Sequence, residues 1–291
     1  MASHAFETVD VFTEQRFGGN PLAVFTDGRG ISDAEMQKLA FEFNLSETTF
    51  VLPPADPANT ARVRIFNRTA EMAFAGHPMI GTAYVLARKS DANQLRFEVP
   101  AGLAVVEIEC NNGEAIGAKV AAPQPVTFGR TFTAEQIAPC LNIAIADIIT
   151  ATHAPIVATV GNPFTCIEVK PEALARCVPD IRAHAAIRDS DPSLHGRFAL
   201  YVYARDGANL RARMFAPLAG TWEDSATGSG ATPLAGLLLH HSDKADLAFD
   251  IRQGVEMGRP SLLSVTARRD GADIRTTVAG RCVPMLKGES Q

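Results

Sequence analysis

The feature that most constrains the fold is a glycine-centred turn followed by a small apolar helical run, which occurs twice. The first copy, at residues 71–78, reads EMAFAGHP and continues as MIGTAYVLA; the second, at 223–230, reads EDSATGSG and continues as ATPLAGLLL. Aligning Gly76 with Gly228 superimposes them. A helix that is apolar all round belongs in a core, so each copy predicts a buried helix. Its N-terminal N–H groups form an anion site, and two facing copies suit a small acid.

The duplication extends beyond these turns. A Gly-Asn-Pro sequence at residues 19–21 precedes the first copy, and another at 161–163 precedes the second by a similar span. Each is followed by an apolar, strand-like stretch, LAVF in the first half and FTCIEV in the second. Further alternating or β-rich runs predict strands at residues 62–66, 103–108, 199–203 and 210–215. Each half therefore reads as mostly strand with one central helix.

Two more helices and a domain crossing are predicted from local signals. Ser32 as N-cap and Glu35 as the partner in a capping box begin a helix that ends at Phe43. A second helix is predicted from Thr133 to Leu141, with a glutamine three residues after Thr133 as the partner in its capping box. The sequence AAPQP at residues 121–125 lies near the middle of the chain, where we expect the crossing between two α+β domains.

Composition excludes several classes of protein. The 291 residues are 46% hydrophobic and 20% charged, which is typical of a globular protein of one large or two smaller domains. The net charge of −5 without a basic stripe argues against nucleic acid, and we expect neither a secretory signal nor a membrane span. An odd number of cysteines without a CxxC pair favours reduced thiols in the cytoplasm. The five cysteines are Cys110, Cys140, Cys166, Cys177 and Cys282.

Glu47 is the candidate proton carrier. It follows the first predicted helix and stands near Leu45, Phe50 and Val51, where the chain enters a strand. If it is buried, desolvation raises its pKa, and a carboxyl group that titrates nearer neutrality both takes and gives a proton. A solvated glutamate in a turn is the alternative.

The repeated turns carry three further candidates. His77 follows Gly76 in the first turn of a predicted helix, whose positive end keeps an imidazole neutral and able to bind a substrate oxygen; a capping or core histidine is the alternative. Asp224 suits a substrate amine or hydroxyl, or orients a neighbour, and is equally explained as a capping residue. Ser229 aligns with His77 and offers its N–H and hydroxyl to a carboxylate.

Other chemistries lack their motifs. The sequence has no GxSxG elbow around its serines, no Walker sequence and no complete GxGxxG. The adjacent His240 and His241 are not accompanied by HExxH or paired CxxC spacing, so no metal site is expected.

Five groups of residues follow one another along almost the whole chain. They are FGGNPLAV at 17–24, NLSET at 44–48, FAGHP at 74–78, EDSATGS at 223–229, and QG at 253–254 with MGRPS at 257–261. Together, in this order, they resemble the phenazine-biosynthesis isomerase (PhzF-like) family.

The resemblance implies an α+β fold of the diaminopimelate-epimerase-like type. In it two pseudo-symmetric domains each form a β-barrel around a central helix, and the active site lies in the cleft between them. The expected halves are residues 1–122 with roughly 279–291, and residues 123–278. The best-known member of the family isomerises a cyclic amino acid without a metal or organic cofactor, and members are commonly homodimers.

The resemblance also assigns roles. The glutamate that matches Glu47 moves the proton in that family. The positions expected to bind the substrate are Gly76, His77, Asp224, Gly228 and Ser229.

The sequence departs from the family at Ser225, where proline is usual, and at Gly230, where alanine is frequent. Related epimerases and proline racemases have a cysteine at each of the two helix N-termini. Here those positions carry His77 or its neighbour and Ser229, and the cysteines lie elsewhere. This disfavours a two-thiol racemase and favours a proton shift by a single carboxylate.

We therefore expect a cytoplasmic, cofactor-independent isomerase that moves a proton on a small amino or cyclic carboxylic acid. One alternative is an epimerase or dehydratase that uses the same cleft, with Asp224 or His77 as a second acid or base. Another is a non-catalytic protein that binds a metabolite. The sequence leaves the physiological substrate open.

Overall fold

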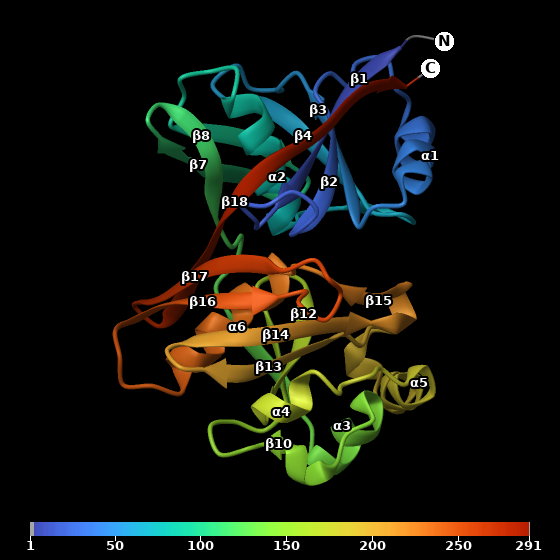
Figure 1. The fold of residues 1–291 in the computed structure, drawn as a ribbon, viewed down its shortest axis with the longest axis vertical. Helices are drawn as coiled ribbons and strands as arrows, with labels where there is room; N and C mark the ends of the chain where they lie inside the picture. The colour runs from blue at the N-terminus through green and yellow to red at the C-terminus, as the bar shows by residue number, and fades with distance from the viewer. Residues whose placement is uncertain (1–2, 291) are drawn as a thin grey trace. The chain divides into compact units, whose positions relative to one another are not determined.

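The last strand of the chain, β18 (Asp273–Ser290), is shared by two units. The computed structural model describes residues 3–290. The first unit consists of Met1–Pro123 and Thr277–Gln291, and the second of Gln124–Thr276. The strand therefore begins in the second unit and ends in the first (Figure 1).

The strands of the first unit close into a ring. The order is β18, β1, β2, β3, β4, β6, β7, β8 and back to β18, with parallel pairing only at β2–β3 and β4–β6 among these. A closed ring leaves no edge strand to pair with another chain. The elements are β1 (His4–Val11), β2 (Asn20–Phe25), α1 (Asp33–Phe43), β3 (Glu47–Leu52), β4 (Ala61–Phe66), β5 (Glu71–Met72), α2 (Gly76–Ala87), β6 (Gln94–Val99), β7 (Gly102–Asn111) and β8 (Glu114–Ala121).

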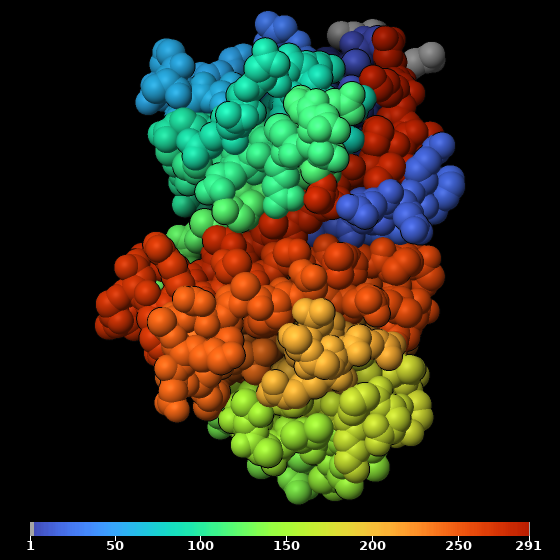
Figure 2. Space-filling model, turned by 60° about the vertical axis from the view of Figure 1, so that its left-hand side comes forward, coloured from blue at the N-terminus to red at the C-terminus, as the bar shows by residue number. Residues whose placement is uncertain are grey.

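Pairing of β1 with β18 joins the two ends of the sequence. His4 lies opposite Ser290, and Val11 lies opposite Cys282. Figure 2 shows the C-terminal strand, in red, beside the N-terminal segment, in blue, on the surface of this unit.

Helix α2 fills the ring. All of its residues except Leu86 are buried, and it contacts β1, β2, β3, β7 and β8 (Figure 1). Gly81 allows this close packing, because a Cβ atom there would stand 2.6 Å from Leu22 Cδ2 and 2.8 Å from Val11 Cγ2. The expected buried helix is confirmed.

Helix α1 covers the outside of this barrel. Met36 and Ala40 pack with Phe25, Phe50 and other apolar side chains of the outer strand faces. The predicted capping box is present: the N–H of Glu35 donates to Ser32 Oγ at 3.3 Å, and the N–H of Ser32 donates to Glu35 Oε2 at 2.9 Å. Asn44 ends the helix in the left-handed conformation.

The second unit repeats this order of strands. It runs β9, β11, β12, β13, β14, β16, β17 and the start of β18, with parallel pairing at β12–β13 and β14–β16. The N–H of Val126, just before β9, donates to the carbonyl of Ile274 in β18 at 2.9 Å, which brings the two ends of the series together. The strands are β9 (Thr127–Thr131), β10 (Ile148–Ile149), β11 (Ile156–Thr159), β12 (Pro163–Val169), β13 (Leu200–Asp206), β14 (Asn209–Ala216), β15 (Thr221–Asp224), β16 (Asp246–Gln253) and β17 (Ser261–Asp270).

Helix α6 (Gly228–His240) takes the place of α2 in this barrel. It contacts β11, β12, β16 and β17, and its residues are buried except Ser229 and His240 at the two ends. Gly230 faces the ring of Tyr201, and Gly236 faces Val126. Pro233 lies inside the helix.

The second unit carries more helix than the sequence predicted. Besides the expected α3 (Ala134–Leu141), it contains α4 (Pro171–Leu174), α5 (Ile181–Ser190) and three short 3₁₀ turns at 145–147, 192–194 and 217–219. Helices α3, α4 and α5 cover the outer strand faces, where Ile137 and Leu174 pack against Val202 and other apolar residues. The expected central helix is present in each half, as α2 and α6, and the helices that were not predicted are α4 and α5 on the outside.

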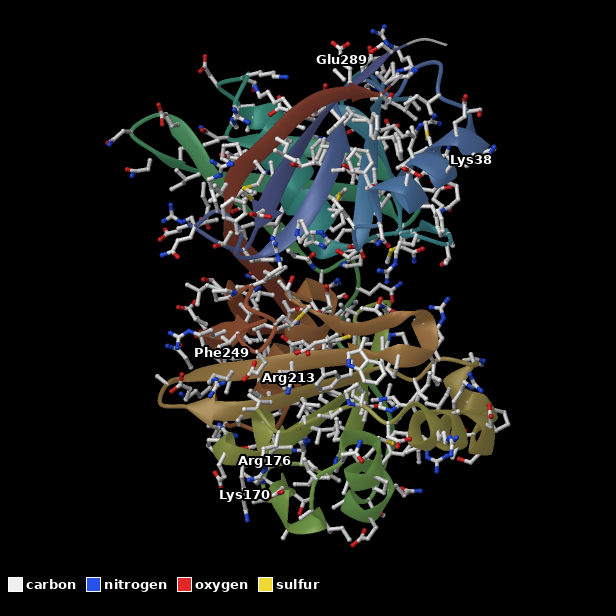
Figure 3. All side chains as sticks on the ribbon, turned by 45° about the vertical axis from the view of Figure 1, so that its right-hand side comes forward. Lys38, Lys170, Arg176, Arg213, Phe249 and Glu289 are labelled. Carbon is white, nitrogen blue, oxygen red and sulfur yellow. The ribbon has the colours of Figure 1, made fainter. Side chains whose placement is uncertain are left out.

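One ion pair is repeated in both units. Arg64 on β4 donates from Nε and Nη2 to the two carboxylate oxygens of Glu71 on β5, each at 2.7 Å. Arg213, which is labelled in Figure 3, lies on β14 and donates in the same way to Glu223 on β15, each at 2.8 Å. Each guanidinium also lies over the phenylalanine two residues later. The two pairs place the short strand before each central helix in the same way.

Candidate active site

Glu47 and His77 meet in the first unit. Glu47 is the first residue of β3, and His77 lies in the first turn of α2. The distance from His77 Nδ1 to Glu47 Oε2 is 3.2 Å. The histidine side chain is 5% exposed and the glutamate side chain 16%, and the carboxylate oxygen Oε2 that faces the imidazole is itself buried.

The first Gly-Asn-Pro turn holds both segments. Ser46 Oγ donates to Asn20 Oδ1 at 2.8 Å, which fixes the residue before Glu47. The imidazole of His77 donates to the backbone carbonyl of Pro21. Gly19 makes the turn possible, because its φ is +62° and a Cβ atom would stand 2.3 Å from the carbonyl oxygen of Val11.

His77 is neutral. Burial lowers its pKa to about 3, and the hydrogen bond to the carbonyl of Pro21 opposes this only in part. Its Nε2 atom is buried and has no hydrogen-bond partner among the described residues, so the N–H lies on Nδ1 and Nε2 keeps its lone pair. The sequence predicted the neutral state from the helix end, and the cause that the structure shows is burial.

The first turns of both central helices lack a hydrogen bond from the side chain of the N-cap residue. Their N-caps are Ala75 for α2 and Thr227 for α6, and at neither end does a side chain of the described residues cap the helix. An alanine cannot cap, and the hydroxyl of Thr227 donates to Asp224 Oδ2 instead. N–H groups in the first turn of a helix therefore stay available to an anion in each unit.

The segment that carries Asp224 is fixed from two sides in the second unit. Glu223, its neighbour, is held by Arg213, whose Nη1 also donates to the carbonyl of Cys177 at 2.8 Å. On the other side Gly254, with a φ of +73°, packs so closely on Ser225 that a Cβ atom would stand 2.6 Å from the carbonyl oxygen of Ser225.

The structure groups the predicted residues by unit. Glu47, Gly76 and His77 lie together in the first unit; Asp224, Gly228 and Ser229 lie on one turn in the second. Sequence reasoning missed the residues that support them. Asn20, Ser46 and Gln253 were noted only as parts of matching motifs, and Thr227 only as a neighbour.

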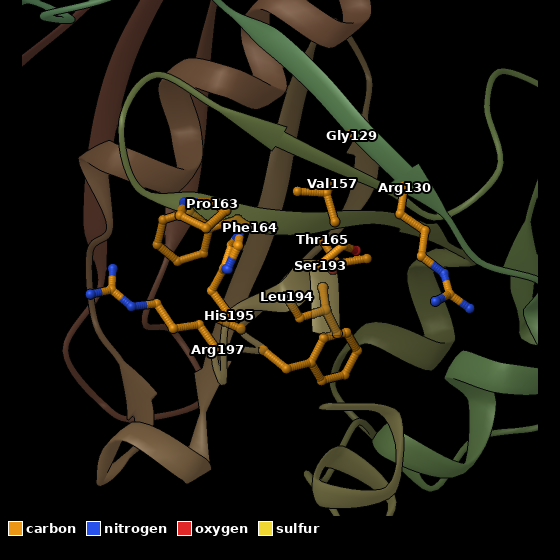
Figure 4. A pocket seen from close by; sticks show the side chains of 12 residues that line it. Gly129, Arg130, Val157, Pro163, Phe164, Thr165, Ser193, Leu194, His195 and Arg197 are labelled. Carbon is orange, nitrogen blue, oxygen red and sulfur yellow. The ribbon is translucent and has the colours of Figure 1, made fainter. Parts of the chain in front are cut away.

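A cavity of about 460 Å³ lies elsewhere in the second unit, and none of the predicted site residues lines it. Its walls are mostly apolar, formed by Val157, Pro163, Phe164, Leu194 and Phe198 together with polar residues. The side chains of Arg130 and Arg197 extend away from it (Figure 4). The cavity is thus separate from the candidate site.

Within residues 3–290, no three His, Cys, Asp or Glu side chains are grouped so that they could hold a metal ion. No helix in the same range is long and apolar enough to cross a membrane.

The family model described as phenazine biosynthesis-like protein (PhzC-PhzF) matches residues 9–288. The chain belongs to this family. It is 35% identical over 288 residues to the trans-2,3-dihydro-3-hydroxyanthranilate isomerase of Pseudomonas fluorescens, in an alignment that covers 98% of each chain. The resemblance seen in the motifs is therefore confirmed, and the chain is an isomerase of the PhzF family.

Solved structures agree with the fold. A PhzF-family protein of Bacillus anthracis superimposes with a TM-score of 0.87 at 23% identity, over 100% of each chain. A predicted epimerase of Pseudomonas aeruginosa gives a TM-score of 0.82 at 28% identity, over 99% of each chain. The diaminopimelate-epimerase-like α+β fold is confirmed.

Proposed function

We propose that this isomerase moves a proton on a small cyclic or amino carboxylic acid, with Glu47 as the only proton carrier and without a cofactor. The observation that carries the proposal is the Glu47–His77 pair at the first turn of α2. The P. fluorescens relative named as an isomerase of trans-2,3-dihydro-3-hydroxyanthranilate supports a substrate of this class.

The proton shift would proceed in two steps. The Glu47 carboxylate takes a proton from a carbon next to an unsaturated or carboxyl-bearing group, and the electron pair delocalises into that group. The resulting Glu47 carboxylic acid returns the proton to another carbon of the same conjugated system. Atoms and charge balance over the cycle, because Glu47 ends as a carboxylate.

The other predicted residues would bind the substrate. N–H groups of Gly76 and His77, and of Gly228 and Ser229, are suited to carboxylate or developing enolate charge. The lone pair on His77 Nε2 is suited to an N–H or O–H of the substrate. Asp224 would bind an amine.

Two further expectations belong to this proposal. Assembly as a homodimer and a cytoplasmic location are properties that the family resemblance implies for this chain. An epimerase or dehydratase with a second acid or base remains the alternative reaction.

The test is proton exchange in D₂O, followed by NMR, with trans-2,3-dihydro-3-hydroxyanthranilate and a panel of small amino and unsaturated cyclic acids. Glu47→Gln removes the basic group and keeps the size of the side chain, so exchange and turnover should fall by about 10²- to 10⁴-fold. Glu42→Gln, at an exposed position of α1, is the matched control and should behave as wild type.

Equal exchange by the Glu47→Gln variant would show that another residue carries the proton. Stabilisation by a compound from the panel without any exchange would favour a binding protein instead.

A further inference from the structure

Gln253, at the end of β16, is a fully buried polar residue that the proposed chemistry does not use. Its Oε1 accepts from the hydroxyl of Tyr201 at 3.0 Å and from the N–H of Thr227 at 3.2 Å. Its Nε2 donates to the carbonyl of Asp224 at 2.9 Å and to Thr227 Oγ1 at 3.0 Å. Every donor and both lone pairs of the amide are therefore satisfied.

The partners fix which way the amide points. A backbone carbonyl can only accept, so the nitrogen of Gln253 must face the carbonyl of Asp224. A backbone N–H can only donate, so the oxygen must face Thr227 N. Turning the amide over would break both bonds and leave buried groups without partners.

This orientation also fixes the hydroxyl of Thr227. Because Thr227 Oγ1 accepts from Gln253 Nε2, its own proton is free to point elsewhere, and it points to Asp224 Oδ2 at 2.6 Å. The hydrogen bonds thus run in one direction, from the side chain of Gln253 through Thr227 to the carboxylate. A carboxylate that accepts such a bond is favoured in its ionised form.

We propose that Gln253 and Thr227 are positioning residues that hold Asp224 as a fixed, ionised carboxylate, which selects substrates with a protonated amine. The inference rests on the proposed function in one respect, namely that Asp224 touches the substrate. It makes Asp224 a group that binds charge rather than a second proton carrier, because the bond from Thr227 favours the ionised carboxylate over the carboxylic acid.

The charged and titratable groups around Asp224 are compatible with this role. On β14 and β15, Arg213 and Glu223 neutralise each other. Burial keeps the phenol of Tyr201 protonated, so it serves as a donor to Gln253. The N-terminal turn of α6 begins four residues after Asp224, at Gly228, and its dipole favours a nearby anion.

The first experiment measures the ionisation of Asp224 directly and needs no turnover. The carboxyl carbon of Asp224 is followed by ¹³C NMR over a pH series, with its signal identified by its absence in Asp224→Asn. In Thr227→Val, which keeps the shape and removes the donor, the pKa of Asp224 should rise by about one unit. Thr227→Ser should restore the wild-type value.

The matched control is Thr232→Val in α6. Thr232 is buried to a similar extent, but its hydroxyl donates only to the carbonyl of Gly228, one turn back, at 2.9 Å. This variant should leave the titration of Asp224 unchanged. An unchanged titration in Thr227→Val as well would overturn the proposal. Thr227→Ala replaces Thr227→Val in the series if the valine variant does not fold.

The second experiment asks whether the carboxylate selects an amine. With wild type, kcat/KM is compared between an amino acid substrate and its analogue without the amine. Thr227→Val no longer holds the carboxylate in one position, so it should lose about 10-fold of that preference, while Thr227→Ser retains it. A preference that Thr227→Val leaves intact would overturn the selective role. If wild type turns over neither compound, the proposed function fails, and the NMR titration alone still decides whether Thr227 holds Asp224 ionised.

Discussion

Ala199 stands in the second barrel at the point where Glu47 stands in the first. In the first barrel Glu47 pairs with Leu22, the residue directly after the Asn-Pro of the Gly-Asn-Pro turn. In the second barrel Thr165, two residues after the same dipeptide, pairs with Leu200. One residue earlier in this parallel register lies Ala199. The repeat is therefore broken at the residue that would carry the proton, and only one barrel has a carboxylate there.

This asymmetry predicts that the enzyme does not racemise its substrate. Inversion at a carbon needs one group to remove the proton and a second on the opposite face to return it, whereas one carboxylate returns it to the face from which it came. Each enantiomer of the amino acids in the panel, incubated in D₂O, should keep its configuration while deuterium enters at the exchanging carbon. Chiral chromatography gives the answer, and loss of optical purity would establish a second acid or base.

The helices that begin with local signals could be predicted from the sequence. The capping box at Ser32 begins α1 at Asp33, and the one at Thr133 begins α3 at Ala134. These bonds join residues three apart, so a short window contains both partners. Helix α5 also has an N-cap side chain, Asp180, but its few buried residues leave a weak apolar pattern, and it was missed.

The closure of the barrels and the support of the site could not be derived in this way. The pairing of His4 with Ser290 joins residues at opposite ends of the chain, and only the family resemblance implied the barrel. Gln253 meets Thr227 across 26 positions of sequence. Nothing near either residue indicates the other, because the contact depends on where β16 runs beside the start of α6.

The buried, neutral His77 predicts a loss of stability in acid. Its pKa is about 3 in the folded protein and about 6.5 in the unfolded chain, so below pH 6.5 the unfolded state binds a proton that the folded state excludes. Above pH 6.5 His77 therefore does not lower the free energy of unfolding. Below pH 6.5 this free energy decreases as the pH falls towards 3. At pH 5 the contribution of His77 is a decrease of about 2 kcal/mol in the free energy of unfolding.

Urea unfolding at pH 7 and pH 5 checks this for wild type and His77→Gln. The variant cannot bind the proton. The decrease in its free energy of unfolding between pH 7 and pH 5 should therefore be smaller than that of wild type by about 2 kcal/mol. The exposed His195 provides the control, since His195→Gln should leave the wild-type difference in place. An equal loss in wild type and His77→Gln would mean that the histidine is already charged when folded.

The two repeated ion pairs should differ in their importance for stability. The side chain of Arg213 is 9% exposed and that of Glu223 10%. Arg213→Met leaves a buried carboxylate without this partner, so it should lower the free energy of unfolding by about 3–5 kcal/mol. Arg64 and Glu71 are 16% and 32% exposed, so water replaces part of the interaction, and Arg64→Met should cost about 1 kcal/mol. Urea unfolding of both variants, one in each barrel, compares them. Equal costs would contradict the argument from burial.

The contact between Gly230 and Tyr201 predicts a change of sign in a double-mutant cycle. A Cβ atom on Gly230 would stand 2.5 Å from Cδ2 of the buried tyrosine ring. In wild type, Gly230→Ala should therefore cost about 1–3 kcal/mol through overpacking. With Tyr201→Leu as background the ring is gone, and the same substitution should stabilise by up to about 1 kcal/mol, because alanine is the better helix former.

Unfolding free energies of the wild type, both single variants and the double variant complete the cycle. The coupling between the two positions should then exceed about 1 kcal/mol, as expected for residues in direct contact. Gly236→Ala, which meets Val126 instead of the tyrosine, is the control whose cost should be the same in both backgrounds. If Gly230→Ala destabilises the Tyr201→Leu background as much as wild type, the limit is the width of the barrel around α6 and not the tyrosine ring.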